Sequence, residues 1–329
     1  MQLCRLTSAS FHGSGQPLGV ETRRTPANSR YDRNMSAQPM NARSWKPTLS
    51  LRPFVSEFAF RDERFDKGQK YTPLTARIDC FLQFYFKSRY RVVNVSSGAI
   101  HLAPRSVLVG PHTQRREDLL CAGHLRIFTI RFSAIGFRAL FGIPARLIAD
   151  YANHADSVLG ASFRELEDRL ASTTVEQMPV VADAFLSCQL GRRNMPPDGG
   201  VAGKLVRSLQ ISHGTVPIGQ IGALHGLSVR QIERIFLEHV GLTPKVFGRL
   251  ARLKRALALG EMETALDWAG IAAASGYFDQ AHMIREFRTF NGATPVQFEA
   301  MKRRGRIYSR EKSNDVAFVQ SHSRYETLA

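Results

Sequence analysis

Two short stretches in the second half of the chain gather basic, amide and small apolar side chains at helical spacing. They are Ser228, Arg230, Glu233 and Arg234 in the first stretch, and Gln280, Ala281, His282, Ile284 and Arg285 in the second. Arginine can bind guanine through two hydrogen bonds, glutamine can bind adenine, glutamate can accept from cytosine, and a small apolar side chain can contact the thymine methyl group. The chemistry these residues could do is therefore the recognition of base edges.

The segments that must position these side chains form a sequence repeat with two copies. Residues 221–247 read IGALHGLSVRQIERIFLEHVGLTPKVF, and residues 271–298 read IAAASGYFDQAHMIREFRTFNGATPVQF. Each copy predicts a short helix, a glycine turn, a second helix ended by glycine, and a Thr-Pro pair that opens a further helix. Helix, turn and helix with a basic outer face is the helix-turn-helix plan, whose second helix enters the DNA major groove.

The apolar positions of the first copy predict which of its side chains pack between its helices. Ile221, Leu224 and Leu227 supply apolar positions around the first helix, and Ser228 can cap the second. In that second helix, one face holds the positions spaced i, i+3, i+4 and i+7. They are Ile232, Ile235, Phe236 and His239.

The second copy repeats each step. Asp279 can cap its second helix, and Met283, Phe287 and Phe290 form the inner face of that helix. A long helix over residues 243–259 is expected to join the two copies.

Residues 204–302 resemble the DNA-binding domain of the AraC/XylS family of bacterial transcriptional regulators. The resemblance rests on GLSVRQIERIFLEHVGLTP, on Arg252-Leu253-Lys254-Arg255-Ala256, and on IAAASGYFDQAHMIREFRTFNGATPVQF. It implies two helix-turn-helix units whose recognition helices enter successive major grooves, one helical turn or ~34 Å apart. Two positions depart from the family pattern, since Ala281 replaces a longer polar side chain or serine and Tyr277 replaces the commoner phenylalanine.

Several of these side chains have structural alternatives to a contact with DNA. Glu233 could pair with Arg230 or Arg234 within its helix, and the outer arginines could be a solvated surface. Arg252, in the joining helix, is expected to contact a phosphate, which positions the protein without specifying sequence. The alternative for Arg252 is packing or pairing inside that helix.

The composition agrees with an anionic partner. Of 329 residues, 45 are lysine or arginine and 28 are aspartate or glutamate, giving a net charge of +17. Such a balance favours nucleic acid or an anionic membrane surface, and no apolar run is long enough for a membrane span. Cys4, Cys80, Cys121 and Cys188 are far apart, which suits a reducing cytoplasm.

The first half of the chain has a different texture. Short runs rich in phenylalanine, valine and isoleucine predict strands of a sandwich or barrel, and the resemblance implies a cupin-like domain for ligand sensing or dimerisation. The runs are FVSEFAF, IDCFLQFYF, YRVVNVSSGAIHL, SVLVGP and LRIFTIRF. The expected fold class is therefore α+β, with a β-rich N-terminal domain and an all-α C-terminal domain.

The predicted boundaries follow composition. They are a disordered segment 1–46, a β-rich domain 47–190 that ends in helices, a linker 191–200, a DNA-binding domain 201–304 and a polar tail 305–329.

Three histidines, His101, His112 and His124, invite a metal interpretation, but no H-x-H pair is present, so no metal or other cofactor is expected. No nucleophile–base motif, phosphate loop or carboxylate pair indicates an enzyme.

The prediction is a cytoplasmic, sequence-specific DNA-binding transcription regulator modulated by a small-molecule effector. The effector residues are unknown. RNA polymerase and a second copy of the chain are left open as partners. The alternative is a DNA-repair or DNA-modifying enzyme that uses the helical domain for targeting, which would need a reactive cysteine.

Overall fold

A computed structural model describes residues 41–193, 195–261 and 267–307. The predictions for residues 1–40 and 308–329 lie outside the described residues. The prediction of disorder up to residue 46 is wrong for Asn41–Trp45, which forms strand β1. The reason is physical: β1 pairs in register with the following strand, and Trp45 is buried in the core, so this short segment gains both hydrogen bonds and apolar burial.

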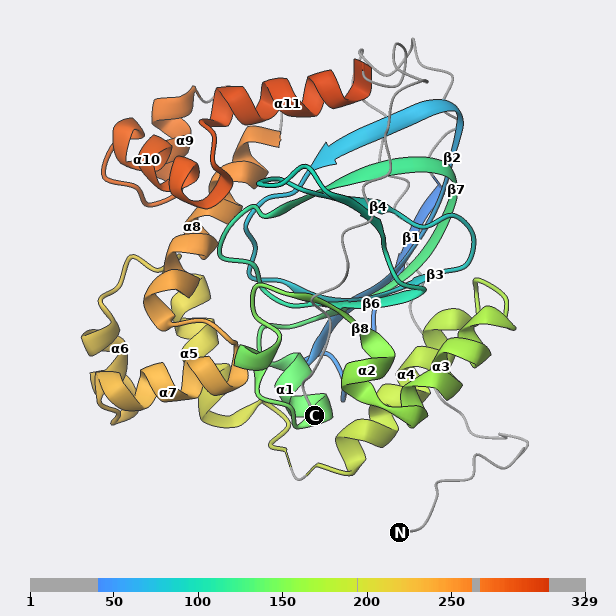
Figure 1. The fold of residues 1–329 in the computed structure, drawn as a ribbon. Helices are drawn as coiled ribbons and strands as arrows, with labels where there is room; N and C mark the ends of the chain where they lie inside the picture. The colour runs from blue at the N-terminus through green and yellow to red at the C-terminus, as the bar shows by residue number, and fades with distance from the viewer. Residues whose placement is uncertain (1–40, 194, 262–266, 308–329) are drawn as a thin grey trace.

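The N-terminal half is built on one sheet of eight strands, which surround a central space (Figure 1). The strands are β1, β2 (Val55–Pro73), β3 (Cys80–Tyr85), β4 (Arg91–Asn94), β5 (Ile100–Leu102), β6 (Ser106–Val109), β7 (Glu117–Phe132) and β8 (Ala152–His154). All pairings among them are antiparallel, in the order β1-β2-β7-β3-β6-β8, with β4 pairing with both β5 and β7. The predicted strand runs are confirmed as parts of this sheet, whereas β8 was not predicted.

The two faces of the sheet differ in what they contact. Along β7, Phe128, Ile130 and Phe132 belong to the main hydrophobic core, while the alternate residues Ile127 and Thr129 line the cavity of the sheet. Successive side chains of a strand point to opposite faces, so this alternation is expected for a sheet that is covered on one face and hollow on the other.

Helices cover the core face and close one end of the sheet. They are α1 (Gly136–Phe141), a 3-10 turn η2 (Ala145–Leu147), α2 (Ala155–Leu159), α3 (Ala161–Ala171) and α4 (Met178–Gly191). These helices contribute Phe137, Phe163 and Leu186 to the core that also holds the phenylalanines of the sheet. The ring of Phe84 in β3 stacks on the ring of Phe163 in α3, with centroids 5.4 Å apart. These helices therefore share the main hydrophobic core with the sheet.

The second half is all helical, as predicted. Its helices are α5 (Gly200–Ile211), α6 (Ile218–His225), α7 (Val229–His239), α8 (Pro244–Glu261), α9 (Trp268–Ala274), α10 (Gln280–Asn291) and α11 (Pro295–Ile307). Helix α8 is the joining helix expected at 243–259. In Figure 1 the pair α6–α7 and the pair α9–α10 lie toward opposite ends of α8. None of the described helices is long and apolar enough to cross a membrane.

Candidate nucleic-acid interface and an internal cavity

The first helix-turn-helix unit is formed by α6 and α7. Helix α6 ends at Gly226, which has a φ of 65°, the left-handed conformation that glycine adopts without strain. Ser228 then caps α7: its hydroxyl accepts from the backbone N–H of Gln231 (3.3 Å), and the Gln231 side chain accepts from the Ser228 backbone (2.8 Å). This reciprocal capping box fixes where α7 begins. The capping box also uses the hydroxyl of Ser228, a residue that the sequence predicted to contact DNA.

The outer face of α7 is exposed, whereas its inner face is buried. Ile232 and Phe236 lie in the core, and the candidate side chains Arg230, Glu233 and Arg234 are exposed. Within the described part of the chain, no ion pair joins Glu233 to either arginine, so the intrahelical pair considered for it does not form. One packing prediction is wrong: the side chain of Leu224 in α6 is 78% exposed.

The second unit, α9 and α10, repeats this construction. Gly276 has a φ of 82°, and the Asp279 carboxylate caps α10 by accepting from the backbone N–H of His282 (2.6 Å). Met283, Phe287 and Phe290 are buried as predicted. Of the candidate residues on α10, Gln280, Ala281 and Arg285 are exposed, and His282 and Ile284 are half-buried. The His282 ring packs edge-on against Tyr277, with centroids 5.4 Å apart, so it serves the fold as well as the surface.

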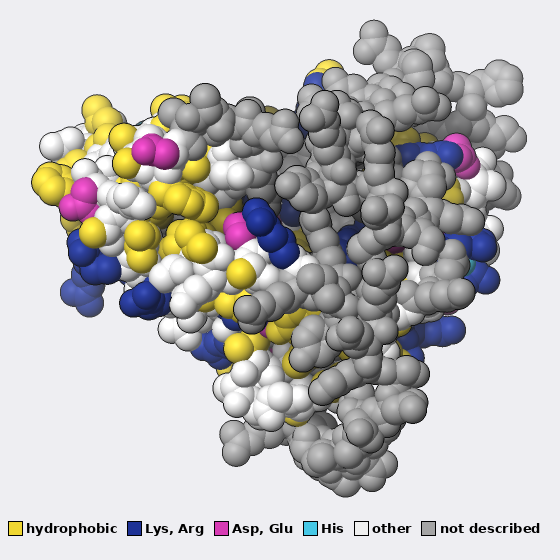
Figure 2. All heavy atoms as spheres, turned by 90° about the horizontal axis from the view of Figure 1, so that it is seen from above, with side chains coloured by type: hydrophobic (Ala, Val, Ile, Leu, Met, Phe, Trp, Pro, Cys, Tyr) yellow, Lys and Arg dark blue, Asp and Glu magenta, His cyan; other side chains and the backbone are white. Residues whose placement is uncertain are grey.

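Sequence reasoning missed Phe278, two residues before α10. Its side chain is 93% exposed, although a phenylalanine buries a large apolar surface when it can. Figure 2 views the molecule from above Figure 1 and shows hydrophobic side chains at the surface over the helical part of the chain. The signal in the sequence was Phe278 itself, an aromatic residue that follows the buried aromatic Tyr277 directly at the start of a recognition helix.

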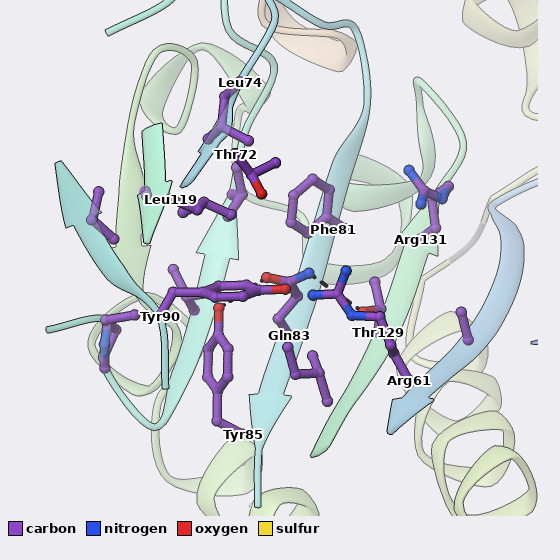
Figure 3. Close-up of a pocket in the computed structure, with 18 of the residues that line it drawn as sticks. Arg61, Thr72, Leu74, Phe81, Gln83, Tyr85, Tyr90, Leu119, Thr129 and Arg131 are labelled. Atoms are coloured by element: carbon purple, nitrogen blue, oxygen red, sulfur yellow. Dashed lines mark hydrogen bonds between the residues drawn. The ribbon is translucent and has the colours of Figure 1, made fainter. Parts of the chain in front are cut away.

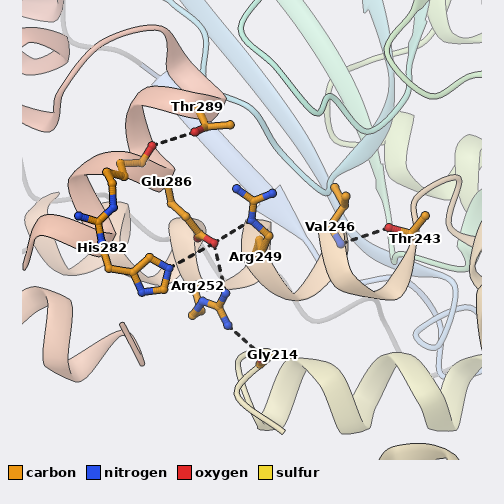
Figure 4. A network of polar contacts seen from close by, with 9 residues as sticks. Gly214, Thr243, Val246, Arg249, Arg252, His282, Glu286 and Thr289 are labelled. Carbon is orange, nitrogen blue, oxygen red and sulfur yellow. Dashed lines mark hydrogen bonds and ion pairs between the residues drawn. The ribbon is translucent and has the colours of Figure 1, made fainter. Parts of the chain in front are cut away.

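The contacts of Arg252 favour the structural alternative over a contact with a DNA phosphate. Its side chain is only 14% exposed, and its guanidinium donates to the carbonyl of Gly214 (2.8 Å) and to Glu286 (3.3 Å) (Figure 4). It also lies over the ring of Tyr277, 5.7 Å from the centroid. Two of its three guanidinium nitrogens therefore have partners inside the domain, which supports the structural alternative considered for Arg252.

The partner of Arg252 is a buried acid on the second recognition helix. Glu286 is 7% exposed and also binds Arg249 (2.7 Å), while His282 lies 3.8 Å from the same oxygen. These contacts join α10 to α8, and Arg252 extends them to the loop after α5. A cleft of about 590 Å³ borders this network, and Lys245, Arg285 and Thr289 are among the residues that line it. This polar network therefore ties the second helix-turn-helix unit to α8 and to the loop after α5.

The sheet encloses a second hollow, a cavity of about 830 Å³. Phe81, Tyr85 and Tyr90 give it aromatic walls, and Leu119 with neighbouring aliphatic residues completes the apolar lining (Figure 3). A volume of this size lies in the range of small-molecule sites, which are mostly apolar with a few polar groups. The cavity can therefore hold a small organic molecule.

The charged groups that line the cavity are mainly cationic. Four arginines line it, Arg43, Arg61, Arg77 and Arg131, against two carboxylates, Glu57 and Glu117. Arg131 binds Glu57 (3.0 Å), and Arg43 pairs with Glu176. Arg61 is 3.9 Å from Glu63 and lies over the Tyr90 ring. Arg77 has no ion pair within the described residues, and its Nε is buried without a hydrogen-bond partner.

Residues 74–79 connect this cavity with the helical domain. The side chain of Arg77 lines the cavity, while its neighbour Ala76 donates its backbone N–H to the side chain of Asn291 at the end of α10 (3.1 Å). Two residues further, Asp79 binds Lys254 of α8 (2.7 Å). One short segment thus contacts the cavity, the second recognition helix and the joining helix.

A separate contact holds the first recognition helix. Glu238 of α7 binds Arg138 of α1 (3.0 Å) and Arg146 of the η2 turn (2.5 Å). Gly241, which follows α7, lies so close to the carbonyl of Ala145 that a Cβ would be 2.6 Å from its oxygen. Both recognition helices therefore touch the N-terminal half of the chain.

The three histidines considered as metal ligands and two of the cysteines are dispersed over the sheet domain. His101 and His154 line the cavity, His112 is buried with Nδ1 2.8 Å from the Gly110 carbonyl, and His124 binds Asp62 (2.7 Å). The described residues contain no group of three or more potential metal ligands. Cys80 and Cys121 are buried, and burial raises the pKa of both thiols, which opposes thiolate formation.

A comparison with protein-family models agrees with the two helix-turn-helix units. Residues 222–301, which span α7, α8, α9 and α10 together with parts of α6 and α11, match a family model described as a helix-turn-helix domain. No curated protein matches the chain.

Among solved structures, ToxT from Vibrio cholerae O395 is 15% identical, with 74% of this chain and 97% of that chain covered and a TM-score of 0.42. Unsaturated fatty acid bound wild-type ToxT from Vibrio cholerae strain SCE256 is 12% identical, with coverage of 74% and 95% and a TM-score of 0.42. The AraC-like transcriptional activator CuxR is 11% identical, with coverage of 68% and 82% and a TM-score of 0.28.

Proposed function

We propose that this chain, whose residues 222–301 form an AraC-type helix-turn-helix domain, is a sequence-specific transcription regulator that contacts two successive major grooves. One observation carries the proposal: two capped helices, α7 and α10, each expose a polar face at opposite ends of α8. A recognition helix places its N-terminal residues against base edges. Arg230, Glu233 and Arg234 would contact one groove, and Gln280, Ala281 and Arg285 the next.

The test begins with selection of a DNA site from a randomised duplex pool, followed by measurement of affinity. Arg234→Ala and Arg285→Ala should each weaken binding to the selected site by about 1–3 kcal/mol and relax preference at one base position. Arg91→Ala is the matched control, because Arg91 is an exposed arginine on β4, away from both helices. If both recognition-helix variants bind like the wild type, α7 and α10 are not the groove-contacting helices.

The same proposal includes a small-molecule effector. The cavity of the sheet supplies a site of suitable size, and residues 74–79 supply a physical connection from that site to α8 and α10. A ligand alters DNA binding only if it interacts differently with two states of the protein. The regulator would act in the cytoplasm, and RNA polymerase and a second copy of the chain are the further partners to test.

The alternative function, a DNA-repair or DNA-modifying enzyme, needs a reactive cysteine. An attacking thiol must be accessible and ionised, whereas Cys80 and Cys121 are buried with raised pKa values. Retained DNA binding and regulation in a Cys80→Ser, Cys121→Ser double variant would support the regulator. Loss of an alkyl-transfer activity in that variant would instead support the enzyme.

A further inference from the structure

Three of the four arginines that line the cavity have carboxylate partners, whereas the fourth, Arg77, has no ion pair within the described residues. Arg131 binds Glu57 (3.0 Å), Arg43 pairs with Glu176, and Arg61 lies 3.9 Å from Glu63. Burying a charge is costly unless the charge is paired and hydrogen-bonded. Arg77 is therefore the position in the cavity that is receptive to an anion.

The cation with the fewest partners is Arg77. Its Nε is buried and has no hydrogen-bond acceptor among the described residues, and its guanidinium lies 5.3 Å from the centroid of Phe81, a ring of the cavity wall. Burial also lowers the pKa of Arg77 to about 10, which shows how strongly the surroundings oppose its charge. A ligand carboxylate beside Arg77 would satisfy the donor and offset this cost.

The rest of the lining specifies the body of the ligand. Phe81, Leu119 and Ile127 offer apolar surface, and the rings of Tyr85 and Tyr90 meet edge to face with centroids 5.4 Å apart. In Figure 3 the guanidinium of Arg61 extends toward Gln83 and Thr129 near these rings. A dianion or a highly polar ligand would leave this wall without complementary contacts.

We propose that the cavity binds an amphipathic carboxylate, with its anionic group at Arg77, its apolar body against the aromatic wall, and Arg61 adding to the positive potential. This inference names the ligand class of the effector site and so rests on the proposed function. Binding to the cavity can nevertheless be measured without DNA. Failure of the ligand claim and failure of the DNA claim are therefore separate results.

The experiment is calorimetric titration of the full chain with two matched pairs of probes: 2-naphthoate with 2-naphthamide, and decanoate with decanamide. Each pair shares its body and differs in charge. In at least one pair the carboxylate should bind at least about tenfold more tightly than the amide, as expected for a charge-assisted hydrogen bond. Equal affinity within both pairs, or no binding of either carboxylate, would overturn the proposal.

Substitutions of the cavity arginines test which of them binds the carboxylate of the ligand. Arg77→Gln should reduce the carboxylate preference at least about tenfold, Arg77→Lys should retain part of it, and Arg61→Gln should reduce it less than Arg77→Gln. Arg126→Gln is the matched control, since Arg126 binds Asp62 and lies outside the cavity lining. A thermal unfolding midpoint for each variant separates loss of binding from loss of fold. A folded Arg77→Gln protein that keeps the full preference would show that Arg77 is not the anion partner.

Discussion

The side-chain carbonyl of Asn291, at the end of the second recognition helix, accepts a hydrogen bond from the backbone N–H of Ala76, which precedes the cavity residue Arg77. The two groups are 3.1 Å apart, buried, and 215 positions apart in the sequence. The backbone N–H of Arg115 likewise donates to the carbonyl of Phe290 (2.8 Å). Two loops of the N-terminal half, before β3 and before β7, therefore hold α10 by its C-terminal end, and the N-terminal residues Gln280 and Ala281 of α10 are exposed.

Asn291→Ala should destabilise the protein by about 1–3 kcal/mol, because it leaves the buried N–H of Ala76 without an acceptor. Urea-induced unfolding measures this change. Asn94→Ala is the control: Asn94 also accepts backbone hydrogen bonds, from Ser96 and Ser97, but in an exposed turn that water can solvate. Equal effects of the two substitutions would contradict the special role of the buried contact.

Glu286→Gln should lower the free energy of unfolding by on the order of 2 kcal/mol. It removes the carboxylate that faces Arg249 and Arg252, and the loss stays below the ~3–5 kcal/mol of a fully buried pair because water reaches Arg249. Glu299→Gln, at a more exposed carboxylate that binds Lys302, should change stability by less than about 1 kcal/mol. Similar losses in both variants would argue that Glu286 is not the centre of the network.

Arg252→Met separates a structural role from a phosphate contact. The variant should be less stable, since it leaves Glu286 with fewer partners, whereas the slope of DNA affinity against salt concentration should stay unchanged. A phosphate contact would contribute about one unit to that slope. DNA affinity measured from low to high salt checks this prediction. A reduced slope in the variant would show that Arg252 contacts a DNA phosphate.

Phe278→Ala should weaken DNA binding while leaving stability within about 0.5 kcal/mol of the wild type. The side chain is 93% exposed, so its removal costs little in the free protein, and its position before Gln280 places it beside the bases that α10 would contact. Ile211→Ala removes another highly exposed apolar side chain, at the end of α5, and should leave affinity unchanged. Unchanged affinity of Phe278→Ala would remove this ring from the interface.

Acid should destabilise the N-terminal half through His112. Burial, followed by the positive charge of Arg77, lowers the pKa of His112 to about 4, from about 6.5 in the unfolded chain. A lowered histidine pKa means that the folded state prefers the neutral ring. Its contribution is complete above pH 6.5 and is lost as the pH falls toward 4, by up to about 3 kcal/mol.

Unfolding free energies measured from pH 7 to pH 4 test this assignment. His112→Asn should remove part of the acid sensitivity, and the exposed His101→Asn should not. If both variants follow the wild-type curve, other groups cause the acid sensitivity.

The sequence predicted the helical half better than the sheet half. Capping residues, glycine turns and buried periodic positions are local signals, so Ser228, Asp279 and Phe287 could be placed from sequence alone. Arg252 could not, because an arginine on a basic helix looks the same whether its partner is a phosphate or a buried acid from another helix. Glu286 resembled an ordinary surface acid for the same reason.

The cavity was hidden because its lining is assembled from residues far apart in the chain. Arg61, Arg77 and Arg131 lie on different segments, and only the pairing of β2, β7 and β3 brings their faces around one space. β1 was missed because its segment is short and polar, and its stability comes from the strand beside it. Non-local pairing of this kind leaves no periodic signal in a single segment.

The alternation along β7 has an evolutionary consequence. Phe128, Ile130 and Phe132 hold the core, whereas Ile127 and Thr129 face the cavity. Substitutions at the second set can change which molecule the cavity accepts while the first set keeps the fold intact. Under the proposed function, such a strand would let a lineage acquire new effectors by small steps, without rebuilding the domain that binds them.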